Sequence, residues 1–169
     1  TAITGNTGLT GGAVNHVGDA TLAITSSTLS GNVAENGGGA FSDGDGEATI
    51  ENSTLSGNRA GQYGGGLLVS SRVVVRNSTI TGNLAAQGGG VNNGGGDIIG
   101  DGIVFLSSSI VASNPTGGNC AGTITSRGGN VENTNTCGLT LLTDQPGTNP
   151  LLGPLASNGG PTQTHALLA

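Results

Sequence analysis

The chain has 169 residues, a usual length for one domain. Glycine contributes 35 residues, aromatic side chains only 2% and charged side chains 8%, and lysine, methionine and tryptophan are absent. So few aromatic residues exclude a thick core of large side chains, and the abundance of Thr, Val, Ile and Leu argues against disorder. The net charge of −6, with four arginines, excludes a stripe of cations for nucleic acid. No apolar run approaches the roughly 18 residues that a membrane helix requires.

A repeat of about 26 residues organises residues 1–115. The dipeptide Gly-Asn recurs at intervals of 26, 26 and 25 residues, with its asparagine at Asn6, Asn32, Asn58 and Asn83. Asn114 follows as a fifth copy without the glycine. A glycine triplet comes later in each middle repeat, at residues 37–39, 64–66 and 88–90, and residues 11–12 form a shorter version.

Aliphatic residues keep a fixed distance from each repeated asparagine. Three columns follow, namely Leu29, Leu55, Ile80 and Val111; Ile24, Ile50, Val75 and Leu106; and Leu22, Ala48, Val73 and Val104. The last two columns are two residues apart, the period of a strand, so both point to one face. Residues between them, such as Phe105, are expected to face outwards. Ser27, Ser53, Ser78 and Ser109 form a further column in register.

The repeat predicts an all-β parallel solenoid with coils of about 26 residues, each about 4.8 Å from the next. Identical side chains then stack on one another, with aliphatic columns inside and asparagine columns that hydrogen-bond along the stack at bends. The glycine triplets are expected where the backbone needs a positive φ or where coils approach closely. A flexible glycine-rich linker would not keep aliphatic residues in register.

One acidic patch is the strongest metal candidate in the repeats. Asp43, Asp45 and Glu47 alternate with glycines and could ligate Ca²⁺, although their spacing is not that of an EF-hand loop. A solvated turn is the competing interpretation, and we likewise expect His16 in a turn. Asp97 and Asp101 resemble a single imperfect copy of a calcium-binding nonapeptide. No cofactor is predicted otherwise.

The threonine column at Thr28, Thr54 and Thr79 raises ice binding as a function. That function needs a flat array of regularly spaced threonines. Ile110 replaces the next threonine and no second threonine column runs beside the first, so the sequence disfavours it.

The repeat stops after residue 115, and residues 116–169 form a C-terminal region with both cysteines of the chain. A disulfide between Cys120 and Cys137 would stabilise the fold by roughly 3 kcal/mol in the chain-entropy model. The alternatives are two free buried cysteines or half of a metal site, but no CxxC or paired histidine supports a metal. A disulfide implies an oxidising, extracellular or cell-surface location. The chain begins at Thr1 and not at Met, as expected for a processed form or an excerpt whose leader has been removed.

The repeated pattern N-S-T-[LI]-[ST]-G-N, at residues 52–58 and 77–83, resembles bacterial right-handed parallel β-helix proteins. The tail resembles the choice-of-anchor Q family at residues 119–124 (NCAGTI), 137–139 (CGL), 149–155 (NPLLGPL) and 158–168 (NGGPTQTHALL). The resemblance covers nearly the whole chain and implies a single-stranded right-handed parallel β-helix, secreted or on the bacterial surface. It also implies that His165 packs within the tail. The family usually continues into a Pro/Ser/Ala-rich stretch, whereas this chain stops at Ala169.

The sequence favours a structural protein over an enzyme. Many parallel β-helices are polysaccharide lyases or hydrolases, and glycoside cleavage needs two carboxylates at a fixed separation, or calcium with a base. Here the richest acidic patch sits in one repeat without acidic equivalents in its neighbours, and Phe41, Tyr63 and Phe105 are too few aromatic platforms for an extended sugar groove. A surface module that binds a glycan, like an adhesin, is the second alternative.

The first repeat suggests how a structural role could work. Residues 1–6 enter partway through a repeat, with Ile3 in the Leu29 column, so the first coil is open. We hypothesise that a second subunit completes it, giving end-to-end self-association into a filament. Residues 163–169, with Gln163, Leu167 and Leu168, are the candidate donor strand. Upstream sequence that is absent from the chain would explain the open coil equally well.

Overall fold

The computed structural model describes residues 1–44, 46–94 and 102–168. These residues form β-strands and no helix, and nearly all strand pairs are parallel. The all-β, largely parallel class that the sequence predicted is therefore confirmed. Within the described ranges, no helix is long and apolar enough to cross a membrane.

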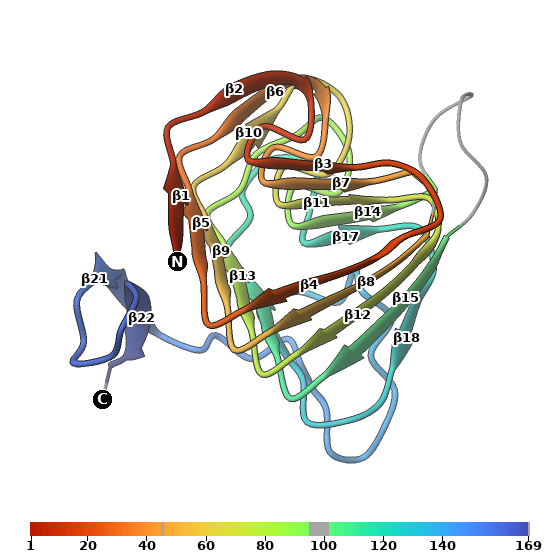
Figure 1. The fold of residues 1–169 in the computed structure, drawn as a ribbon. Helices are drawn as coiled ribbons and strands as arrows, with labels where there is room; N and C mark the ends of the chain where they lie inside the picture. The colour runs from red at the N-terminus through yellow and green to blue at the C-terminus, as the bar shows by residue number, and fades with distance from the viewer. Residues whose placement is uncertain (45, 95–101, 169) are drawn as a thin grey trace.

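Four parallel sheets, named A to D, collect one strand each from successive repeats (Figure 1). Sheet A contains β1 (Ala2–Thr4), β5 (Thr28–Ser30), β9 (Thr54–Ser56), β13 (Thr79–Thr81), β16 (Ile110–Ala112), β19 (Val131–Glu132) and β20 (Gln145–Pro146). Sheet B contains β2 (Thr7–Thr10), β6 (Val33–Gly37) and β10 (Arg59–Ala60). Sheet C contains β3 (Val14–His16), β7 (Phe41–Asp43), β11 (Leu67–Val69), β14 (Val91–Asn93) and β17 (Cys120–Ala121). Sheet D contains β4 (Thr21–Thr25), β8 (Glu47–Glu51), β12 (Arg72–Arg76), β15 (Ile103–Ser107) and β18 (Ile124–Ser126).

The pairing register confirms the aliphatic columns. In sheet A, Leu29 pairs with both Ile3 and Leu55, and Ile80 pairs with both Leu55 and Val111. In sheet D the Ile24 and Leu22 columns pair in the same order that the sequence predicts. Every repeat thus places the same kind of side chain at the same point of its sheet.

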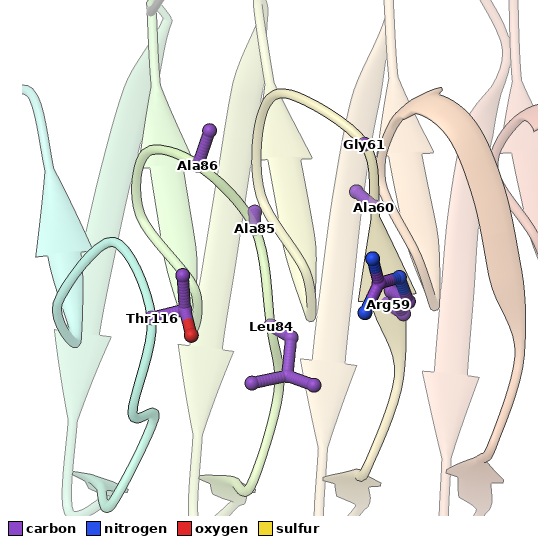
Figure 2. A pocket seen from close by; sticks show the side chains of 7 residues that line it. All are labelled: Arg59, Ala60, Gly61, Leu84, Ala85, Ala86 and Thr116. Atoms are coloured by element: carbon purple, nitrogen blue, oxygen red, sulfur yellow. The ribbon is translucent and has the colours of Figure 1, made fainter.

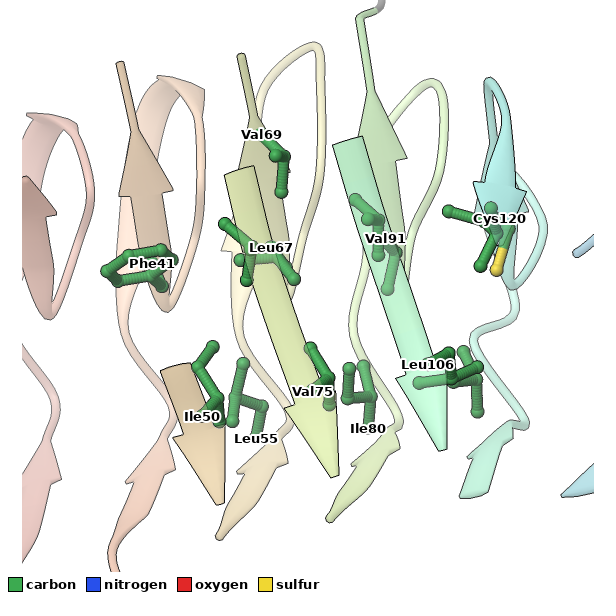
Figure 3. Close-up of a cluster of buried hydrophobic side chains, with 14 of the residues drawn as sticks. Phe41, Ile50, Leu55, Leu67, Val69, Val75, Ile80, Val91, Leu106 and Cys120 are labelled. Atoms are coloured by element: carbon green, nitrogen blue, oxygen red, sulfur yellow. The ribbon is translucent and has the colours of Figure 1, made fainter. Parts of the chain in front are cut away.

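The interior is built from small and medium aliphatic side chains. Figure 3 shows side chains of sheets A, C and D meeting there, among them Phe41, Ile50, Leu55 and Leu67. All four are fully buried. Phe41 is the only aromatic side chain in this cluster among the described residues, so the core is filled by Leu, Ile and Val packed across the sheets.

Two polar ladders run along the stack beside the aliphatic columns. In the first, both the backbone N and the side-chain Nδ2 of each asparagine donate to Oδ1 of the next, through Asn6, Asn32, Asn58, Asn83 and Asn114. In the second, the backbone N of each serine donates to Oγ of the next, through Ser27, Ser53, Ser78 and Ser109. The predicted asparagine ladder is confirmed, and the turn residues hydrogen-bond one another instead of water.

The glycine triplets meet both expectations made for them. Gly64 has a φ of +58°, a conformation that costs glycine little. A Cβ atom on Gly39 would collide with the carbonyl oxygen of Gly65 in the next repeat. The repeats therefore pack so closely at this bend that only glycine fits.

The parallel pairing continues past residue 115, where the repeated sequence pattern ends. Cys120 pairs with Val91, Ile124 with Val104, and Val131 with Ile110. Residues 133–144 then cross to this end of the stack, where Cys137 and Leu139 join the buried cluster. The predicted disulfide between Cys120 and Cys137 is present, with Cα atoms 4.9 Å apart.

The last described residues form an antiparallel hairpin of β21 (Leu152–Ala156) and β22 (Thr164–Leu167). The hairpin folds back towards sheet A (Figure 1), where Thr28 Oγ1 donates to the Gln163 carbonyl at 2.7 Å. Ser56 Oγ and His165 Nε2 lie 2.8 Å apart, and His165 Nδ1 lies 2.7 Å from the Gly153 carbonyl oxygen, so His165 contacts both the tail and sheet A. Thr28 and Thr54 belong to the column considered for ice binding, and both are buried.

Candidate functional site

The outer face of sheet D gathers three of the four arginines of the chain beside Phe105. We call it the sheet D face and define it by Glu47, Glu51, Arg72, Arg76, Phe105 and Arg127. Strands alternate their side chains, so Val73 and Val75 of β12 point inwards while Arg72, Val74 and Arg76 point outwards. Register places Arg72 beside Glu47, and Arg76 beside Glu51. Arginine side chains of β12 and glutamate side chains of β8 therefore lie side by side on this face.

Two guanidinium groups lie over one aromatic ring on this face. The Arg127 guanidinium carbon is 3.8 Å from the centroid of the Phe105 ring, and that of Arg72 is 5.2 Å away. Cations at such distances are attracted by the electrons of the ring face. Phe105 thus faces outwards as predicted, and it holds two donor-rich groups in place.

Ion pairs complete the face on the side nearer the N-terminus. Arg72 Nη1 lies 3.2 Å from Glu47 Oε2, and Arg76 Nε lies 3.5 Å from Glu51 Oε2. These pairs are largely solvent-exposed and contribute little to stability. Arg127 has no carboxylate partner among the described residues. A planar guanidinium that is free of a carboxylate can bind carboxylate, sulfate or phosphate groups through paired hydrogen bonds.

Sequence reasoning found Phe105 but missed the arginines around it. Arg72 and Arg76 flank an aliphatic strand at the outward positions, so the alternation in β12 was a usable signal. Arg127 lies after the repeated pattern ends, and its place beside Phe105 follows only from the pairing of β15 with β18.

A shallow groove lies over the bend where sheet B ends (Figure 2). Its volume is about 200 Å³, below the several hundred cubic ångströms of most ligand pockets. It is lined by Arg59, Ala60, Gly61, Leu84, Ala85, Ala86 and Thr116. Arg59 is the single charged side chain in this lining, so the groove offers a ligand little beyond one cation and small apolar walls.

The structure does not bring Asp43 and Glu47 together. Asp43 is fully buried, with Oδ1 2.6 Å from His16 Nδ1 and Oδ2 accepting a short hydrogen bond from Ser71. Glu47 is exposed and faces Arg72. Asp45 lies outside the described residues, as do Asp97 and Asp101. Within the described ranges, no group of three or more His, Cys, Asp or Glu side chains is arranged to hold a metal ion.

The sequence-based expectations for His16 and Asp43 are wrong. His16 is not a turn residue, because it ends β3 and is buried with a 9% exposed fraction. Asp43 does not belong to a solvated turn either. The register places His16 directly against Asp43, so the two polar side chains pair inside the stack, while the buried Nε2 of His16 has no hydrogen-bond partner among the described residues.

The residues proposed for assembly lie at two places. Ile3 is half-buried in β1, at the edge of sheet A. Gln163 precedes β22, and Leu167 and Leu168 are exposed near the end of the hairpin. Thr164–Leu167 is a strand, as expected for a donor, but it pairs antiparallel with β21 of its own hairpin.

Comparisons with known proteins add no relative. No family model matches the chain, and no match was found among the curated proteins or the solved structures.

Proposed function

We propose that this chain is an extracellular structural module with the right-handed parallel β-helix fold of the choice-of-anchor Q family. The observation that carries the proposal is the in-register pairing of identical columns, such as Leu29 with Leu55 and Leu55 with Ile80. Such a stack gains stability repeat by repeat. It suits a rigid spacer or scaffold whose length is set by the number of repeats.

The chemistry of the chain supports an extracellular location. The Cys120–Cys137 disulfide persists in oxidising surroundings and is rare in reducing ones. The net charge of −6 keeps a protein with so few charged residues soluble. Antibody labelling of intact source cells tests this part of the proposal, since an intracellular signal alone would contradict it.

Deletion of one whole repeat tests the structural module. Removing residues 33–58 joins Asn32 to Arg59, the residue that stands in register with Val33. Every column then stays aligned, so we expect a shorter protein that still unfolds cooperatively. Removing residues 33–45 alone takes every later column out of line with the first repeat and should prevent folding. A folded half-repeat variant, or an unfolded whole-repeat variant, would overturn the proposal.

End-to-end association of copies is a separate part of the proposal, and the two ends differ in their suitability for it. Residues 133–144 lie across the C-terminal end, and Pro146 in the edge strand β20 has no N–H to donate. Head-to-tail stacking therefore requires an incoming copy to displace this segment. Sedimentation of the native protein at high concentration tests it, and a monomer throughout would exclude the filament.

The sheet D face supports a second candidate function, the binding of acidic glycans as an adhesin-like module. The observation that favours this function is the position of two arginines over Phe105. One of them, Arg127, has no carboxylate partner within the described chain. An aromatic ring with flanking guanidinium groups can contact a sugar ring and its carboxylate or sulfate together.

A glycan array with neutral and acidic oligosaccharides tests this candidate. We expect binding to acidic glycans that weakens with salt and falls about tenfold or more in Arg127→Ala, the effect of losing one charged hydrogen bond. Arg59→Ala is the matched control, because Arg59 lies in the groove of Figure 2 and not on the sheet D face. Equal binding of neutral glycans, or equal loss in the control, would contradict it.

Catalysis ranks behind both candidates. The closest histidine–carboxylate pair is His16 with Asp43, and burial removes both side chains from any substrate.

A further inference from the structure

Two buried carboxylates stand where the two polar ladders end. Asn114 donates to Asn119 Oδ1. Asn119 Nδ2 in turn lies 2.9 Å from Asn133 Oδ1 and from Thr134 Oγ1, and 3.3 Å from Glu132 Oε1. Glu132 is fully buried. The asparagine ladder begins at the exposed Asn6, runs through the stack and reaches the Glu132 carboxylate both directly and through Thr134, whose Oγ1 donates to Glu132 Oε1 at 2.6 Å.

The serine ladder ends in the same way. Ser109 N donates to Asn130 Oδ1 at 3.1 Å. The backbone N and Nδ2 of Asn130 then donate to Asp144 Oδ1, at 3.0 Å and 3.1 Å. Asp144 is nearly buried, with a 9% exposed fraction. By register, Glu132 stands in line with the Leu29 column and Asp144 in line with the Ser27 column, but neither column carries a charged side chain in the repeats.

An ionised carboxylate is suited to ending such a ladder. An amide both donates and accepts, so every added asparagine creates a new donor that needs an acceptor. In the asparagine ladder the backbone N and one Nδ2 proton of each asparagine point towards the C-terminal end, while the other Nδ2 proton bonds a carbonyl of the preceding repeat. A carboxylate only accepts, and it therefore closes the series without leaving an unpaired donor. Hydrogen bonds aligned in a chain also polarise one another, which strengthens the bond to the final charge.

The same two carboxylates hold the segment that covers this end. Glu132 Oε1 accepts from Thr136 N at 2.7 Å and from Thr134 Oγ1 at 2.6 Å, and Oε2 accepts from Cys137 N at 3.1 Å. Asp144 Oδ2 accepts from Leu141 N at 3.2 Å and from Ser126 Oγ at 2.7 Å. The covering segment is thus fixed through acceptors that must be ionised to serve all their donors.

We propose that Glu132 and Asp144 form an acid-labile end cap. Their ionised carboxylates hold residues 133–144 across the C-terminal end, and protonation releases this segment while the repeats stay folded. This inference concerns a conformational device and does not depend on the proposed function.

Electrostatics agrees with the geometry. Burial acts to raise the pKa of Glu132, but the hydrogen bonds from Thr134, Thr136 and Cys137 outweigh it and leave the pKa below its ordinary value of 4.5. Burial is likewise outweighed at Asp144 by hydrogen bonds from Ser126, Asn130 and Leu141, so its pKa lies below 3.8.

A lowered pKa in the folded state fixes the direction of the pH effect. The unfolded carboxyl binds protons more readily, so the ionised cap contributes its full stability above the ordinary pKa values. That stability is lost as the pH falls from about 4.5 through the lower folded pKa values.

No other ionisable side chain intervenes at the cap among the described contacts. The groups that face Glu132 come from Asn119 and residues 134–137, and those that face Asp144 come from Ser126, Asn130 and Leu141. None of these titrates. Arg127 is next to Ser126 in sequence, but its guanidinium lies over Phe105. The acid response is therefore assigned to the two carboxylates themselves.

Hydrogen exchange from pH 7 to pH 2.5, corrected for the intrinsic pH dependence of exchange, tests the proposal in the wild-type protein. We expect the amides of Thr136, Cys137 and Leu141 to lose protection below about pH 4.5, the ordinary value of Glu132. Amides of β8 and β12 should keep theirs. Protection of the cap throughout this range, or equal loss in the repeats, would overturn the proposal.

Two variants test whether Glu132 and Asp144 cause the acid response of the cap. Glu132→Gln and Asp144→Asn replace an accept-only group by an amide, and each should raise exchange of the cap amides at pH 7 by about 10-fold to 100-fold, as for the loss of a hydrogen bond to a charged group. Their remaining protection should vary less with pH than in the wild type. Glu51→Gln is the matched control, because Glu51 pairs with Arg76 on the sheet D face. If Glu51→Gln raised the exchange of the cap amides as much as the two variants do, the acid response could not be assigned to Glu132 and Asp144. The wild-type titration decides the proposal even if a variant does not fold.

Discussion

Residues 1–112 and residues 116–168 hold their backbone in place by different means. In the first region the ladder contacts recur, and the bond from Asn32 to Asn58 is repeated from Asn58 to Asn83; the pair of His16 and Asp43 is an exception. In the second region each contact occurs once. The disulfide and the contact of His165 with Ser56 have no counterpart elsewhere in the described chain.

The difference teaches where the fold is tolerant and where it is not. A repeated contact has an equivalent contact on either side, so its loss also lowers the stability of the neighbouring repeats. A contact made once fixes one segment, and its loss should free that segment alone. The predictions below test this contrast.

The largest effect is expected inside the asparagine ladder. Asn58→Ala leaves the backbone N of Asn32 and the carbonyl of Leu29 without their side-chain partner, and both are buried. Each unpaired buried group costs about 1–3 kcal/mol, so the free energy of unfolding should fall by about 2–6 kcal/mol. Urea denaturation measures it. Asn6→Ala is the control, since Asn6 is exposed and should cost well under half as much; equal losses would show that the ladder does not act through burial.

Removing the disulfide should give the next largest effect, and a more local one. The double variant Cys120→Ser, Cys137→Ser should lose about 3 kcal/mol, as expected for a closed loop of this length. Exchange should rise first at residues 120–144 and only later in the repeats. Reducing agent should destabilise the wild type and leave the variant unchanged. A uniform rise along the chain would contradict the contrast between the two regions.

The repeated region could be predicted because the same pattern occurs several times in the sequence. The columns of Leu29 and Ser27 were each visible in four copies, and the structure places them in register. The register also showed that Phe105 faces outwards. One copy of such a pattern would not have distinguished a strand from a turn.

Contacts made once could not be predicted for the same reason. Glu132 is an isolated carboxylate in the sequence, and nothing near it indicates that it ends a ladder begun more than a hundred residues earlier. His16 was misplaced because its partner Asp43 is 27 residues away, and the column that they share with Val69 and Asn93 has no repeated residue type. The disulfide was the exception, since two cysteines allow only one pairing.

The hairpin of β21 and β22 should show a smaller effect. His165→Ala removes the contacts with Ser56 and with the Gly153 carbonyl, which are worth about 0.5–1.5 kcal/mol each. We expect loss of protection in β22 with little change in the unfolding of the repeats. Gln163→Ala is the matched control, because Thr28 bonds only the backbone carbonyl of Gln163. Hydrogen exchange distinguishes the two variants; a global loss of stability in His165→Ala would mean that the hairpin is part of the core.

The smallest effect is expected within the end cap, at a side chain that points away from it. Leu142 is fully exposed, while Leu139, three residues earlier, is buried among the core residues. Leu142→Ser should change the free energy of unfolding by less than about 0.5 kcal/mol, whereas Leu139→Ala should cost about 2–5 kcal/mol. Thermal and urea unfolding of both variants checks this pair. A large effect of Leu142→Ser would mean that Leu142 packs against the molecule, and the cap would then be held by more than its buried leucine, its disulfide and its two carboxylates.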